Sequence, residues 1–183
     1  MSEELMVKNC SPTLAGIKTG NMFSCGYKDI KELKTALRAW NRSLVKKGLR
    51  VVPLKAEGGR ALIYVYRPKR LVRDWDDVEA AKILCERGYN PKSAEISLNM
   101  LIKKLREKRD FPHEVGLFLG YPPEDVKGFI ENRADNFKCV GCWKVYGDVE
   151  KAKKIFEKYK KCTDVYCAQY AKGSNISKLT VAV

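Results

Sequence analysis

A single apolar stripe over residues 28–47 is the feature that most constrains how this chain can fold. Apolar side chains recur there at intervals of three and four residues, which is the repeat of one face of an α-helix. Lysine and arginine fill most of the opposite face, and Gly48 follows at a position suited to a helix end. The segment therefore predicts a long amphipathic helix that packs one face on a core. The stripe consists of Ile30, Leu33, Leu37, Trp40 and Leu44.

Two segments with strand character follow this helix. Residues 49–54 and 60–67 are rich in Val, Leu, Ile and Tyr, and they flank the glycine-containing turn at 57–59. Because proline has no backbone N–H to donate, Pro53 indicates that the first of these strands lies at a sheet edge. The sequence predicts a β-hairpin here.

The rest of the chain is mainly helical in pattern. Predicted helices cover 76–87, 94–108 and 112–119, another begins at Pro122, and a short one begins at Ser11 and Pro12. The last third predicts a strand at 142–146, helices from Asp148 and over 163–173, and a strand at 178–183.

No regular alternation of strands and helices is present, so the predicted fold class is α+β. We expect a single helix-rich domain over residues 1–183, built around a small, mainly antiparallel sheet. This sheet is expected to combine the 49–67 hairpin with the two strands of a C-terminal strand–helix–helix–strand unit at 138–183.

Charge is concentrated in one part of the chain. The formal net charge is +14, and residues 28–73 hold 14 Lys and Arg against 3 Asp and Glu. This distribution predicts a basic face and an acidic partner, either nucleic acid or an acidic protein. No apolar run approaches the roughly 20 residues that cross a bilayer, and acidic residues stand near the start. We therefore expect no membrane association and a cytoplasmic location.

The chain has seven cysteines. Because disulfides are rare in the cytoplasm, we expect these cysteines to be thiols or metal ligands. Cys139 and Cys142 form a C-x2-C pair whose spacing suits one tetrahedral ion, and Cys162 and Cys167 form a looser C-x4-C pair. The four together predict a site for zinc or iron. Two alternatives stay open: buried structural thiols, or a redox pair at the first two positions.

Cys10 and His113 suggest a different chemistry. Cys10 precedes the helix predicted to begin at Ser11, where a helix dipole would favour a thiolate. A nucleophilic cysteine needs a base, and the chain has one histidine, His113, next to Glu114. These residues would suit acyl or thiol transfer; the alternative is that each has a separate structural role.

A third hypothesis is nucleic-acid binding through the basic 28–73 segment. Tyr64 and Tyr66 share one face of a predicted strand, so both rings could stack on bases, although they could equally pack beneath a helix. The candidate nucleic-acid or anion-binding residues are Lys18, Arg60, Tyr64, Tyr66, Arg67 and Arg70. The alternative is a solvated basic face.

Three colinear segments carry a resemblance to a known family. They are the sequence from Cys10 to Thr19, the sequence from Phe111 to Val126, and the stretch from Cys142 to Thr163 that contains CWKVYGD, FEKY and CT. Together they resemble the bacterial family named domain of unknown function 3793. The resemblance implies a single-domain protein of anaerobic-type bacteria, and it implies no activity, cofactor or catalytic residue.

The sequence leads to one preferred function and two alternatives. The preferred function is a cytoplasmic, thiol-rich accessory or regulatory protein that binds a metal or is redox-linked. The alternatives are the cysteine-dependent enzyme and the nucleic-acid-binding module.

Overall fold

The computed structural model describes residues 2–107 and 111–183. The chain divides into two compact units. The terminal unit comprises Met1–Lys69 and Lys161–Val183, and the middle unit comprises Arg70–Lys160. The predicted α+β class, helix-rich with a small antiparallel sheet, is confirmed.

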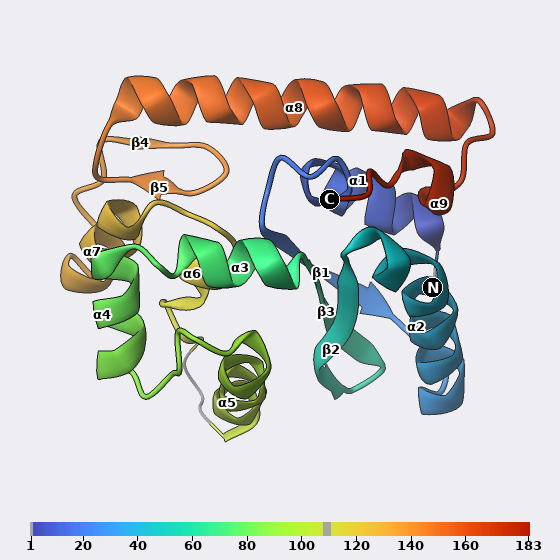
Figure 1. Cartoon of the computed structure of the whole chain (residues 1–183), viewed down its shortest axis with the longest axis horizontal. Coiled ribbons are helices and arrows are strands. Elements are labelled where there is room, and N and C mark those ends of the chain that lie inside the picture. The colour runs from blue at the N-terminus through green and yellow to red at the C-terminus, as the bar shows by residue number, and fades with distance from the viewer. Residues whose placement is uncertain (1, 108–110) are drawn as a thin grey trace. The chain divides into compact units, whose positions relative to one another are not determined.

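The terminal unit is built on a three-stranded antiparallel sheet in the order β1-β3-β2 (Figure 1). Its strands are β1 (Gly20–Gly26), β2 (Arg50–Glu57) and β3 (Arg60–Tyr66). The predicted hairpin is β2–β3, and its turn uses Gly58 and Gly59 at φ values of 56° and 74°. The prediction that Pro53 marks an edge strand is confirmed, because β2 pairs with β3 alone and its register shifts between Pro53 and Lys55.

Two long helices cover this sheet. Helix α2 (Ile30–Leu44) confirms four of the five predicted stripe positions: Leu33, Leu37, Trp40 and Leu44 are buried, whereas Ile30, the first residue of the helix, is 47% exposed. A single 3-10 turn, η1 (Val45–Lys47), leads to Gly48 at φ 80°. Asp29 caps the helix by accepting hydrogen bonds from the backbone N–H groups of Lys31 and Glu32. The stripe packs in one core with residues of α1 and of the strands, including Val7, Cys10, Leu14, Phe23, Val51, Ile63 and Val65.

Helix α1 (Glu3–Leu14) begins nine residues earlier than Ser11–Pro12 predicts. The prediction is wrong because Ser2 is the cap: its hydroxyl accepts a hydrogen bond from the backbone N–H of Leu5. Ser11 instead lies inside the helix and donates its hydroxyl to the carbonyl of Val7. Pro12 lies in the last turn of the helix, where it has no N–H to donate to the carbonyl of the preceding turn, and the helix ends two residues later.

The predicted C-terminal strand is also wrong. Residues 176–179 form a short helix, α9 (Ile176–Leu179), and no strand follows it. Side chains, rather than a neighbouring strand, bind the carbonyl groups of this terminus. Lys47 Nζ donates to Thr180 O at 2.8 Å, and Arg67 Nη2 donates to Val181 O at 2.8 Å. The hairpin takes its third strand from β1, which the sequence analysis missed. The strand predicted at 142–146 does not join this sheet either: its residues 144–145 form a strand in a separate two-stranded sheet.

The middle unit begins within a helical segment and is largely helical. Its helices are α3 (Pro68–Asp74), α4 (Val78–Glu86), α5 (Ala94–Glu107), α6 (Val115–Phe118) and α7 (Pro123–Glu131). Four of these were predicted, and α3 was missed. Residue 108, the last residue of the helix predicted at 94–108, lies outside the described residues.

A small hairpin, β4 (Cys139–Val140) with β5 (Lys144–Val145), follows α7 and leads to helix α8 (Val149–Ala171). Asp148 caps α8, as expected, by accepting from the backbone N–H of Lys151 at 3.0 Å. The sequence predicts two helices here, but α8 is one unbroken helix of 23 residues (Figure 1). Among the described residues, no helix is both long and apolar enough to span a membrane.

Candidate functional site

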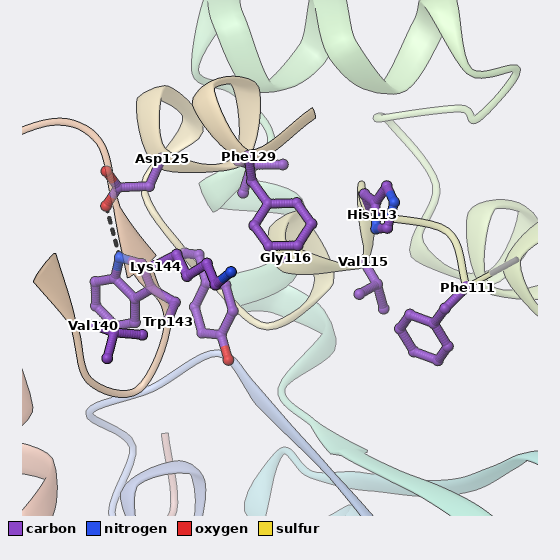
Figure 2. Close-up of a pocket in the computed structure, with 11 residues that line it drawn as sticks. Phe111, His113, Val115, Gly116, Asp125, Phe129, Val140, Trp143 and Lys144 are labelled. Atoms are coloured by element: carbon purple, nitrogen blue, oxygen red, sulfur yellow. Dashed lines mark hydrogen bonds between the residues drawn. The ribbon is translucent and has the colours of Figure 1, made fainter. Parts of the chain in front are cut away.

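The middle unit contains a pocket of about 330 Å³ between α6, α7 and the β4–β5 hairpin (Figure 2). Most of its lining is apolar or aromatic, and in Figure 2 Trp143 and Val140 lie at one end and His113 and Phe111 at the other. Among the residues that the structure describes, the lining consists of Phe111, His113, Val115, Gly116, Tyr121, Asp125, Val126, Phe129, Val140, Trp143 and Lys144. Concave apolar surfaces of this size with a few polar groups are typical of small-molecule sites.

Asp125 fixes the hairpin that forms one wall of the pocket. This carboxylate is buried and accepts hydrogen bonds from Trp143 Nε1 at 2.6 Å and from the backbone N–H groups of Tyr146 and Gly147, both at 2.7 Å. Three donors therefore satisfy the buried charge. Asp125 is a structural anchor for the wall, and its oxygen atoms are already occupied.

Aromatic rings build this wall. Tyr121 stacks on Trp143 with centroids 4.9 Å apart, and Phe156 of α8 contacts Trp143 edge-on at 4.5 Å. The Tyr121 hydroxyl donates to Cys142 O at 3.1 Å, and burial raises the pKa of Tyr121 to about 12. Gly141 lies where a Cβ atom would overlap the Phe156 ring, so the hairpin can approach α8 only without a side chain there.

The floor of the pocket depends on a second close approach. A Cβ on Gly116 would lie 2.7 Å from Val126 Cγ2 and 3.1 Å from Tyr121 Cδ2. Glycine at this position therefore lets α6 pack directly against α7 and the Tyr121 ring. The elements around the pocket are therefore closely packed at this point.

Besides Asp125 and Tyr121, whose oxygen atoms form hydrogen bonds within the wall, Lys144 and His113 provide the polar groups of the pocket. Lys144 Nζ donates to Ala134 O at 2.7 Å and lies over the rings of Phe137 and Phe129, 4.6 Å and 5.9 Å from their centroids. An ammonium has three donors, and this one uses a single hydrogen bond within the described part of the chain. The His113 ring is exposed and meets Phe129 edge-on at 5.0 Å, with no hydrogen bond to any described residue.

Glu114, a sequence-based catalytic candidate, has a structural environment. It is buried and accepts hydrogen bonds from Tyr89 Oη and Lys104 Nζ, both at 3.0 Å, and from Arg87 Nη1 at 3.4 Å. Burial acts to raise the pKa of Glu114, but a backbone N–H and the contacts with Lys104 and Tyr89 outweigh it, so the pKa is lowered. Its carboxylate joins the segment that follows α4, which contains Arg87 and Tyr89, to Lys104 of α5.

Cys10 does not lie at a helix N-terminus as predicted. It sits inside α1, fully buried in the core of the terminal unit, because α1 starts at Glu3. Burial raises the pKa of the Cys10 thiol well above its usual range, with a smaller opposing effect of Lys18. This environment keeps the thiol protonated, whereas an activated nucleophile needs a lowered pKa.

The four candidate metal ligands lie in both units. Cys139 and Cys142 belong to the β4–β5 segment of the middle unit, and Cys162 and Cys167 lie on the part of α8 that belongs to the terminal unit. Since α8 is unbroken, the last two are separated by about 140° around its axis. None of the seven cysteines forms a disulfide, and residues 2–107 and 111–183 contain no group of three or more His, Cys, Asp or Glu that could hold a metal ion. The metal site stays a prediction.

The candidate nucleic-acid residues are mostly buried. Tyr64 and Tyr66 are 0% and 6% exposed, and their rings stack on each other at 4.6 Å. Lys18 and Arg67 are 4% and 2% exposed, and Arg67 donates to the carbonyls of Thr13, Leu14, Lys47 and Val181. Arg70 is half-buried, and Arg60 is exposed. The structure thus does not present these six as one open face.

Of the sequence-based candidates, only His113 lines the pocket. The other lining residues were missed because α6, α7 and the hairpin meet only in the folded chain. One signal was present in the sequence: residues 111–143 contain six aromatic residues, and four of them, Phe111, Tyr121, Phe129 and Trp143, line the pocket.

Fold and site define the class: a helix-rich α+β protein with an aromatic pocket in its middle unit. The model of a family described as "Protein of unknown function (DUF3793)" matches residues 6–180. The chain therefore belongs to this family, as the three colinear segments suggested. No curated protein and no solved structure matched the chain.

Proposed function

We propose that the middle unit binds a flat, largely apolar organic anion in the pocket between α6, α7 and the β4–β5 hairpin. The observation that carries the proposal is the aromatic lining, which also includes Lys144, whose ammonium lies 5.9 Å from the centroid of the Phe129 ring. Apolar pockets with few, well-placed polar groups are the usual form of small-molecule sites.

The shape of the ligand is suggested by the rings. Phe129, Trp143 and Tyr121 all line the same volume of about 330 Å³, and a planar ring system suits such an aromatic lining without many polar contacts. The carboxylate of Asp125 also lines the pocket, but its oxygen atoms accept hydrogen bonds from three N–H donors. These donors offset its negative charge, so its repulsion of a bound anion is reduced.

The charge of the ligand is suggested by Lys144. Its ammonium keeps two donors beyond the bond to Ala134, and a carboxylate or sulfonate can accept them at the pocket. His113 gives a second polar contact at the opposite end of the pocket (Figure 2). This arrangement supports a ligand-responsive accessory or regulatory protein, and the thiol-dependent alternatives gain no support from it.

The test compares two fluorescent probes that differ by one charge. 1-Anilinonaphthalene-8-sulfonate carries an anion, and N-phenyl-1-naphthylamine has the same ring system without it. We expect both to bind the native protein at one site, and Phe129→Ala to weaken both. Lys144→Met should weaken the sulfonate probe about tenfold, which corresponds to about 1.4 kcal/mol, and leave the neutral probe within a factor of two.

Lys151→Met is the matched control, because Lys151 is exposed on α8 and does not line the pocket. It should leave both affinities unchanged. The proposal fails when neither probe binds at one site, or when Phe129→Ala folds normally and binds both probes as the unchanged protein does.

A further inference from the structure

The exposed face of α2, continued by the 3-10 turn η1 that contains Lys46, carries a continuous row of basic side chains. They recur every three or four residues, so they lie along one side of the helix, opposite the buried stripe. All five are exposed. The row consists of Lys31, Lys34, Arg38, Arg42 and Lys46.

This charge is not neutralised within its own unit. None of the five side chains forms an ion pair with a residue that the structure describes. Residues 33–56 contain seven Lys and Arg and no Asp or Glu, and the exposed Arg50 begins the neighbouring strand β2. Acidic residues stand only at the start of the helix, at Asp29 and Glu32.

The row is held rigidly. Four apolar residues of α2 are buried, and Asn41 connects the helix to the edge strand: its amide nitrogen donates to Val51 O at 2.7 Å, and its amide oxygen accepts from Val51 N at 2.9 Å. Lys47, next to the row, donates to Ser177 O and Thr180 O, which fixes the end of the helix. The backbone positions from which the basic side chains project are therefore fixed on a packed helix.

We propose that this face of α2 binds the phosphate backbone of a nucleic acid strand, independently of the base sequence. Four residues of helix span about 6 Å, so the row offers a cation at intervals of about 5–6 Å over a length of about 22 Å. Such a row complements a linear polyanion with closely spaced charges. The inference goes beyond the ligand pocket and uses no residue of it.

The chemistry of the face favours nucleic acid over a lipid surface. The exposed residues between the cations are small or polar, such as Thr35 and Ala39, so the face has no apolar side chains to insert among lipid tails. Ile30, 47% exposed, stands at the N-terminal end alone. Trp40, the aromatic residue of α2, is buried, so base stacking is absent from the face and the binding is electrostatic.

The test measures binding of a fluorescein-labelled 20-nucleotide oligo-dT strand by anisotropy. With five phosphate contacts, the slope of log K against log salt is about −3.5 for a single strand, so affinity should fall on the order of a hundredfold between 50 and 200 mM NaCl. Arg38→Glu with Arg42→Glu should lower affinity at least tenfold at 50 mM NaCl and make the slope shallower.

The matched control is Lys151→Glu with Lys154→Glu, which makes the same charge change on the exposed surface of α8. It should keep affinity within about threefold and preserve the salt slope. Arg38→Gln with Arg42→Gln is a milder variant, and thermal unfolding by circular dichroism shows whether each variant folds.

Three results would overturn the inference. One is no binding of the strand at 50 mM NaCl, and another is an equal loss in the α8 control. The third is binding to vesicles of 70% phosphatidylcholine and 30% phosphatidylserine without binding to the strand. Binding of the two fluorescent probes is measured on the same variants and should be unchanged. A failure of the nucleic-acid proposal can therefore be distinguished from a failure of the ligand-site proposal.

Discussion

The indole N–H of Trp143 donates a 2.6 Å hydrogen bond to the buried carboxylate of Asp125. This bond joins the first turn of α7 to the loop of the β4–β5 hairpin, eighteen residues further along the chain. The same carboxylate receives the N–H groups of Tyr146 and Gly147. A single carboxylate, which accepts hydrogen bonds from three N–H groups, therefore fixes the wall of the pocket to α7.

Replacing this carboxylate should destabilise the middle unit and distort the pocket. In Asp125→Asn, the amide N–H2 group would face at least one of the three donors, so a buried N–H loses its acceptor. We expect the free energy of unfolding to fall by about 1–3 kcal/mol in urea titrations, with weaker binding of both fluorescent probes. Glu124→Gln, at the neighbouring exposed position, should change neither quantity. Equal stability of the two variants would contradict this role of Asp125.

The buried guanidinium of Arg67 should be indispensable to the terminal unit. It donates to four carbonyl oxygens, at the end of α1, the end of η1 and the C-terminal segment. Lysine has one nitrogen and no planar fork, so Arg67→Lys leaves several of these acceptors unsatisfied. The expected loss of unfolding free energy is about 3 kcal/mol or more.

Arg73→Lys is the matched control for Arg67→Lys, since Arg73 is exposed on α3. Its unfolding curve should overlay that of the unchanged protein. If Arg67→Lys unfolds at the same urea concentration as this control, the guanidinium is not what holds the three segments together.

Local patterns were sufficient to predict α2 and the β2–β3 hairpin. In α2 the buried stripe and the capping Asp29 act within one helix, and in the hairpin Gly58 and Gly59 supply the turn. Such elements are specified by neighbours in the sequence, so periodicity and turn residues are enough to recognise them.

Elements that depend on distant partners were missed or wrong. Strand β1 pairs with β3 some forty residues away, and its own sequence, GNMFSCG, shows no regular alternation. Residues 178–183 have high strand propensity, yet Lys47 and Arg67 occupy the carbonyls of Thr180 and Val181. These tertiary hydrogen bonds determine the conformation of the segment in place of its intrinsic strand propensity. The pocket was missed for the same reason, since its walls come from separate segments.

Acid should destabilise the middle unit through Glu114. The lowered pKa means that the folded state binds a proton less readily than the unfolded chain, whose Glu pKa is near 4.5. The stabilisation from Glu114 is then complete above about pH 4.5 and is lost as the pH falls through the folded-state pKa. Unfolding free energies measured by urea titration between pH 7 and pH 3 should show this decrease.

Glu114→Gln should remove that part of the pH dependence, at the cost of lower stability at pH 7, because Lys104 and Arg87 lose their anionic partner. Glu86→Gln, exposed at the end of α4, is the control and should keep the pH dependence of the unchanged protein. A Glu114→Gln curve parallel to that of the unchanged protein at all pH values would refute the assignment.

Thiol labelling should separate the cysteines by burial and decide the role of Cys10. Cys85 and Cys142 are exposed, whereas Cys10 is fully buried with a raised pKa. With N-ethylmaleimide at pH 7 and peptide mass spectrometry, the exposed pair should react at least tenfold faster than Cys10. Because the folded state holds the Cys10 proton more tightly than the unfolded chain, this thiol also lowers stability as the pH rises above about 9, and Cys10→Ala should flatten that decrease. Labelling of Cys10 as fast as Cys142 would instead identify an accessible, activated thiol and revive the cysteine-dependent enzyme.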